Sequence, residues 1–259
     1  MIDHNWKKKN IFLILCGSSV SIMESDVMGR KSPLHDRQTS TLEIKPFDYL
    51  ESSVFFPEYS NEDKLLAYGI LGGIPRYLGA FDPNLSIEKN IANKIICNGA
   101  YLHEEPDNLL KAELREINVY SSILAAIANG RNKVVDIANY IHEERTKVSK
   151  YLITLQTLRL IEKRIPCGDK ETSKKSIYVI KDNFFEFWFR YEFTNNSYYA
   201  MLGANDASKK IMEDISNLMG DVFEDICKEY LIRLAKCRKL PFIPYHLGKW
   251  WGTNPALKA

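Results

Sequence analysis

Two hydroxyl side chains follow an apolar run close to the start of the chain. The run, residues 11–16, has the length of a strand, and Gly17, Ser18 and Ser19 end it. A strand that is apolar on both faces is typical of the middle of a parallel α/β sheet. Such sheets place ligand-contacting groups at the carboxyl ends of their strands. The pattern therefore predicts Ser18 and Ser19 at a strand tip that faces a ligand. A buried strand without a site remains an alternative, and a lipoprotein signal is disfavoured because the apolar segment is too short.

A second group of side chains could bind the phosphates of nucleic acid. Four lie on the exposed side of one predicted helix: Arg145, Lys147, Ser149 and Lys150. Five lie on a predicted hairpin: Lys163, Arg164, Lys170, Lys174 and Lys175. Cations on a helix and a neighbouring wing suit a helix in the major groove with the wing on the phosphates. The alternative is a protein-interaction or spacer module whose charged face is simply solvated.

The elements that would position these cations are three helices followed by a hairpin. Apolar residues recur at helical spacing over residues 119–128, 134–141 and 148–160. Two short strands follow, residues 160–165 and 176–180, joined by a polar turn. This order predicts a winged helix.

The rest of the chain has mostly helical spacing. A second strand is expected at residues 39–44, helices from residue 61 to about 110, an aromatic helix at 183–193 and one amphipathic helix at about 211–237. An extended piece, residues 241–251, comes last. The expected fold class is mainly α with small β elements, an α+β arrangement.

Composition limits the classes of protein that fit. The chain has 259 residues, with 35 Lys and Arg against 33 Asp and Glu, so the overall charge gives no argument for nucleic acid. No apolar run approaches a membrane span, and we expect no membrane partner. The five cysteines include no CxxC pair. An odd number of widely spaced cysteines indicates reduced thiols in a cytoplasmic protein rather than a disulfide framework or a zinc site.

Several short motifs, in their order along the chain, carry a family resemblance. They are ILCGSS, PLHDR, KPFDY, FFPEY, LGGIPRYL, EPDNLLKAELRE, FEDICKEYL and GKWW. Together with the predicted winged helix they resemble the archaeal-type AAA+/STAND ATPases that carry a C-terminal DUF234 domain, a relative of the PD-(D/E)XK nucleases. Members of that family use ATP and Mg²⁺.

The resemblance implies roles for residues in the first third of the chain. Ser18 and Ser19 match a sensor position that feels the terminal phosphate. Arg37 matches a candidate arginine finger, although His35 and Asp36 replace the usual aromatic-glycine pair before it. A lid turn near the nucleotide is matched by Gly72, Gly73 and Pro75. The competing interpretations are helix-capping serines, a surface ion pair for Arg37 and plain helix punctuation for the lid turn.

At the other end the resemblance reaches the nuclease-like domain. Glu224 matches an acidic residue on its first helix, and Trp250 and Trp251 match a GxWW strand. No carboxylate follows Glu229, so this sequence supplies no acidic pair for a metal that activates water, and we expect no metal site. A solvent-facing Glu224 on an amphipathic helix is the simpler interpretation.

These readings give four expected domains. They are a remnant of a parallel α/β ATPase core (1–58), a helical lid (59–112), the winged helix (113–182) and a partial nuclease-like domain (183–259). We expect this chain to be the middle-to-C-terminal part of such an ATPase. Two alternatives stay open: a free-standing winged-helix DNA-binding regulator, or an interaction subunit that lends Arg37 and the lid to a separate ATPase. The expected partners are double-stranded DNA and a further copy of the chain or another ATPase subunit.

One consequence is the absence of turnover by the chain alone. The sequence contains no GxxxxGK[ST] loop, since Gly29–Ser32 lacks the second glycine before the lysine. Without backbone amides and a lysine around the phosphates, and without an acid to hold Mg²⁺, the remaining candidates have nothing to act on. We expect no ATPase and no metal-dependent nuclease activity above background. Turnover that disappears in Arg37→Ala would contradict this.

Overall fold

A computed structural model describes residues 10–17, 23, 27–30, 32, 35, 37 and 39–251. The chain divides into two compact units, residues 1–42 and 43–259, and each is described by itself. Among the described residues, no helix is both long enough and apolar enough to cross a membrane.

The two strands expected near the start are not found. Residues 11–16 have neither helix nor strand, and their side chains are exposed, Phe12 at 88%. Residues 39–44 are likewise irregular and exposed. Both strand predictions are therefore wrong. A strand is held by backbone hydrogen bonds to neighbours, however apolar its sequence. In the part of the chain that the structure describes, neither segment has such a neighbour, because the only sheet there joins β1 and β2.

Short helices make up most of residues 49–113, and the helical spacing predicts those from residue 61 onward, whereas the first of them lies before that range. They are α1 (Tyr49–Ser53), α2 (Asn61–Leu71), α3 (Pro75–Leu78), α4 (Ile87–Asn90), the π-helical η3 (Ile91–Ile96) and α5 (Tyr101–Glu113). Asp48 and Glu51 cap the start of α1 reciprocally, each accepting from the backbone N–H of the other. Buried Asn90 donates to the carbonyls of Asp82 and Leu85 and so holds the turn between α3 and α4.

Residues 117–180 form the predicted sequence of three helices and a hairpin. The helices are α6 (Ile117–Ala128), α7 (Val134–Ile141) and α8 (Arg145–Thr157), and the strands are β1 (Ile161–Arg164) and β2 (Ile177–Ile180). The strands pair antiparallel, with Ile161 opposite Ile180 and Arg164 opposite Ile177. Most of the apolar positions that predicted the helices are buried, including Ile123, Ile137, Val148, Leu152 and Leu155. We call these residues the three-helix–hairpin unit.

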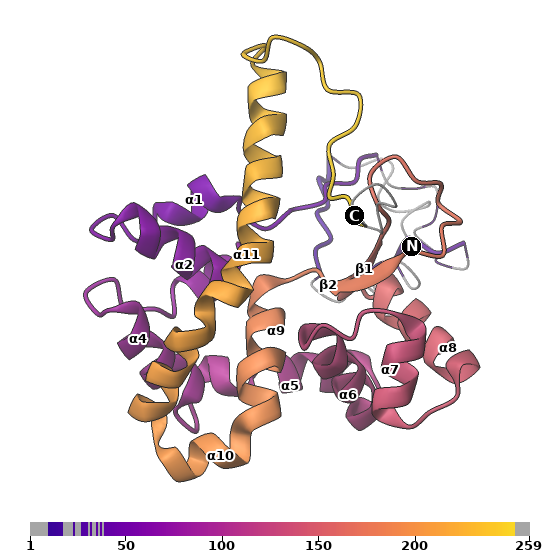
Figure 1. Ribbon diagram of the computed structural model, residues 1–259. Helices are drawn as coiled ribbons and strands as arrows, with labels where there is room; N and C mark the ends of the chain where they lie inside the picture. The colour runs from indigo at the N-terminus through magenta and orange to yellow at the C-terminus, as the bar shows by residue number, and fades with distance from the viewer. Residues whose placement is uncertain are drawn as a thin grey trace, which may run out of the picture. The chain divides into compact units, whose positions relative to one another are not determined.

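The last third is built on aromatic residues and one long helix. It contains α9 (Asn183–Phe187), the π-helical η4 (Trp188–Phe193), α10 (Thr194–Leu202) and α11 (Ala204–Lys236). Figure 1 shows α11 in orange to yellow, beside α2 and α4 along its first half. Its buried face consists of residues three or four apart: Ile211, Ile215, Leu218, Val222 and Ile226. This confirms the amphipathic helix expected there. After α11 the chain returns toward the hairpin (Figure 1).

Candidate nucleic-acid interface

Helix α8 buries most of its apolar side chains and leaves its cations exposed. Val148 and Leu152 are fully buried, whereas Arg145, Lys147 and Lys150 are exposed. Lys147 donates to Glu143 one turn earlier at 2.8 Å, and this hydrogen bond raises the pKa of Lys147 above its ordinary value. Arg145 and Lys150 form no ion pair with any described residue. Arg145 and Lys150 are thus the α8 cations open to a phosphate.

The segment between the two strands, residues 165–176, is called the wing loop below. Lys163 just before it and Lys174 within it are exposed and form no ion pair with the described residues. Lys175 lies 3.4 Å from Asp169, yet its side chain remains 54% exposed. In the wing loop, Lys174 is therefore fully available to a phosphate and Lys175 is partly available.

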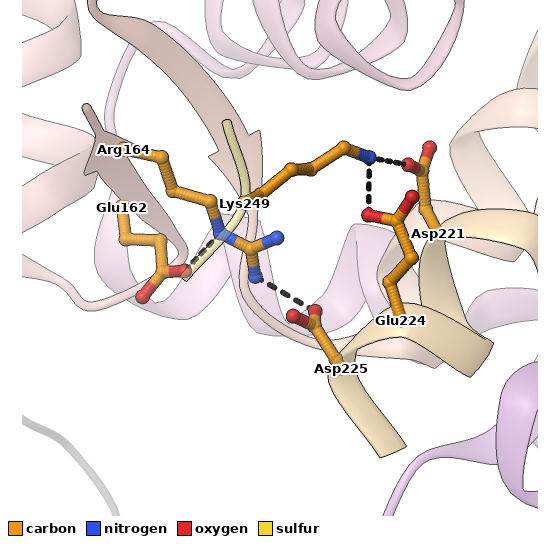
Figure 2. Close-up of polar contacts among 6 residues, drawn as sticks. All are labelled: Glu162, Arg164, Asp221, Glu224, Asp225 and Lys249. Atoms are coloured by element: carbon orange, nitrogen blue, oxygen red, sulfur yellow. Dashed lines mark hydrogen bonds and ion pairs between the residues drawn. The ribbon is translucent and has the colours of Figure 1, made fainter. Parts of the chain in front are cut away.

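Arg164 lies in different surroundings from the other cations of the hairpin. Its Nε is 2.5 Å from Glu162 and a terminal nitrogen is 2.9 Å from Asp225 of α11, as Figure 2 shows. The side chain is only 29% exposed. A guanidinium held between two carboxylates joins the hairpin to α11, and it has little capacity left for a phosphate.

The candidate acid Glu224 also belongs to an ion-pair cluster. Lys249, beyond the end of α11, contacts Glu224 at 2.7 Å and Asp221 at 2.6 Å (Figure 2). In the described residues, no three His, Cys, Asp or Glu side chains gather as metal ligands would. Close by on α9, burial and the Asp221 carboxylate raise the pKa of Glu186 to about 7. The geometry supports a solvent-facing, ion-paired Glu224.

A small cleft lies beside this cluster. It has a volume of about 230 Å³ and is lined by Glu162, Arg164, Asp225, Lys228 and Glu229 together with Tyr68, Lys181, Asn183, Val222 and Ile232. Charges of both signs line it, so it favours neither an anion nor a cation.

The predicted lid turn has a packing role. Gly72 ends α2 with φ +66°, a conformation that favours glycine, and Pro75 begins α3. The Gly73 carbonyl accepts the N–H of Phe47 at 2.8 Å. The structure therefore supports the simpler interpretation, in which these residues end one helix and begin the next.

Of the three remaining candidates, the structure describes one. Arg37 is exposed. Ser18 and Ser19 lie outside the described residues. The roles of all three in a nucleotide site stay predictions.

Sequence reasoning missed the contacts of Lys249 and Trp251. The GKWW motif marks this segment in the sequence. Its ion pairs with α11 and its contact with the wing loop join residues far apart in the chain, so no local sequence pattern indicates them. The indole Nε1–H of Trp251 donates to the Lys175 carbonyl at 2.8 Å, across 76 positions of sequence.

Comparison with known proteins matches both ends of the chain to families. Residues 1–81 match a family described as an ATPase domain predominantly from Archaea, and residues 188–257 match DUF234, described as archaeal and bacterial proteins of unknown function. A protein of Methanocaldococcus jannaschii, named as the uncharacterized protein MJECL04, is 37% identical over 251 residues. That alignment takes in 97% of this chain and 56% of the relative, so the chain spans little more than half of that protein's length. No solved structure matches the chain.

Proposed function

We propose that the three-helix–hairpin unit is a winged helix that binds double-stranded DNA, in a chain whose two ends match an archaeal ATPase domain and DUF234. In the complete ATPase this unit would attach the ATP- and Mg²⁺-dependent machinery to DNA. AAA+/STAND membership, ATP binding and inactivity of the chain by itself are part of the same proposal.

The observation that carries the proposal is a set of exposed cations that form no ion pair with the residues that the structure describes. Arg145 begins α8, Lys150 follows five residues later, and Lys163 and Lys174 lie just before the wing loop and within it. Surface cations that already have partners gain little from a phosphate, whereas these four are open to one. Arg164 is left out of the proposed interface because Glu162 and Asp225 hold it.

The position of Arg145 suits base contact. In helix-turn-helix proteins the residues at the N-terminal end of the recognition helix reach the base edges. The preceding residue, Glu144, is the N-cap of α8, so Arg145 stands in its first turn. Within this proposal Arg145 contributes to sequence preference, and the wing lysines contribute affinity for any sequence.

The test is fluorescence anisotropy with a labelled duplex at two salt concentrations. We expect weak binding, with a dissociation constant of about 10⁻⁴–10⁻⁶ M that rises steeply with salt. Lys174→Glu combined with Lys175→Glu should weaken binding to all duplexes by about tenfold or more and reduce the salt slope by about 2.

The matched control reverses two exposed lysines elsewhere, Lys236 at the end of α11 and Lys239 just after it. Lys236→Glu with Lys239→Glu makes the same change in net charge and should leave most of the affinity intact. Equal losses of DNA affinity in the two double variants would show that net charge alone, and not the position of the wing lysines, determines binding. If the anisotropy does not change when the unaltered chain is titrated at low salt, the DNA proposal is wrong and the unit is better explained as a protein-interaction module.

A further inference from the structure

The segment of residues 248–251, called the strap below, touches both ends of the wing loop. The N–H of Cys167, near the start of the loop, donates to the Lys249 carbonyl at 2.8 Å. The indole N–H of Trp251 donates to the carbonyl of Lys175, near the end of the loop, also at 2.8 Å. A Cβ built on Gly248 would lie 3.4 Å from the Cβ of Cys167, so the two backbones approach closely.

The side chain of Lys249 fastens the strap to α11. Lys249 Nζ lies between Asp221 and Glu224, which are three residues apart and so on one face of the helix (Figure 2). Although burial works against its charge, the hydrogen bonds to these carboxylates raise the pKa of Lys249 above its ordinary value. The ammonium is thus an anchor that stays charged at neutral pH.

The contacts hold the backbone of the wing loop and leave its charges accessible. The two hydrogen bonds described above between the loop and the strap use main-chain groups of the loop. The N–H of Cys167 donates one, and the carbonyl of Lys175 accepts the other. Lys174 and Lys175 remain exposed beside them. The wing loop loses conformational freedom when both of its ends are fixed. Because the strap fixes them before any ligand binds, ordering the loop on a ligand costs less entropy.

We propose that Lys249 and Trp251 are positioning residues for the wing: the strap, anchored on Asp221 and Glu224, holds the wing loop in the conformation that binds DNA. The proposal rests on the proposed DNA-binding function of the three-helix–hairpin unit. It assigns to the DUF234-matching region a role in setting DNA affinity without touching DNA.

The decisive variant is Asp221→Asn with Glu224→Gln in the full chain. It removes the anchor of Lys249 and makes the protein more positive by two charges, a change that by electrostatics alone should tighten DNA binding. The strap proposal expects the reverse. Amide hydrogen exchange of residues 167–176 should become about fivefold faster or more, and DNA affinity should fall by about threefold or more.

The matched control places the same charge change on α11 away from the strap. Asp206→Asn with Glu213→Gln should leave exchange in the wing loop unchanged and should bind DNA at least as tightly as the unaltered chain. Trp251→Phe is the second variant, because it deletes only the indole N–H that contacts the Lys175 carbonyl and keeps an aromatic ring. It should also speed exchange in the loop.

Exchange that is unaltered in both strap variants would overturn the proposal whatever happens to DNA. Faster exchange with unchanged or tighter DNA binding would overturn the positioning role. If the unaltered chain binds no duplex, the proposed DNA-binding function is wrong. Faster exchange in the strap variants would then show only that the strap stabilises the conformation of the loop. Faster exchange together with weaker binding supports the proposal.

Discussion

Replacing Gly73 with alanine is expected to destabilise the protein by about 3 kcal/mol. A Cβ at this position would lie 1.9 Å from the backbone oxygen of Phe47 and 2.7 Å from its nitrogen. Both atoms belong to main chain, and the Phe47 N–H is itself bonded to the Gly73 carbonyl. The segment before α1 would therefore have to move away from the turn between α2 and α3, breaking that hydrogen bond.

The control is the same substitution where space is open. Gly220 lies in α11, and nothing comes within 4 Å of a Cβ built there. Gly220→Ala should stabilise the protein by about 1 kcal/mol, because alanine loses less entropy than glycine in a helix. Urea denaturation followed by circular dichroism measures both effects. Equal midpoints for the two variants would show that the close approach to Phe47 does not constrain position 73.

Stability is expected to fall as the pH rises from about 4.5 to about 7. Burial and the neighbouring Asp221 and Asp225 carboxylates raise the pKa of Glu186 to about 7, against opposing effects of Arg190 and Arg164. The folded protein therefore keeps a proton that the unfolded chain releases near pH 4.5, and folding loses free energy as that proton is removed. The loss at neutral pH is about 3 kcal/mol. Burial also raises the pKa of Asp182, to about 6, which acts in the same direction.

Glu186→Gln should remove most of this dependence, since glutamine resembles the protonated acid and does not ionise. Urea midpoints at pH 5, 6 and 7 in the variant should lie closer together than in the unaltered protein. The control is Glu213→Gln on the exposed side of α11, which should keep the full dependence. Parallel pH profiles for the unaltered protein and Glu186→Gln would show that another group is responsible.

Periodicity along the sequence determined the helical part of the fold. Val148, Leu152 and Leu155 recur at the spacing of a helix, and all three lie in the core of the three-helix–hairpin unit. The α11 face from Ile211 to Ile226 follows the same rule. Each helix satisfies its own backbone hydrogen bonds, so a local pattern suffices to indicate it. The motifs likewise indicated the archaeal ATPase and DUF234 families, to which comparison matches residues 1–81 and 188–257.

Tertiary structure decided what depends on partners distant in the sequence. Residues 11–16 have the composition of a buried strand, but a strand requires a neighbour, and their side chains are exposed. Arg164 counts as one more wing cation in the sequence, and only the fold brings it to Asp225, 61 positions away. Lys249 reaches Asp221 across 28 positions. Charge type can be read from the sequence, but pairing depends on which side chains the packed helices and the hairpin bring within a few ångströms of each other.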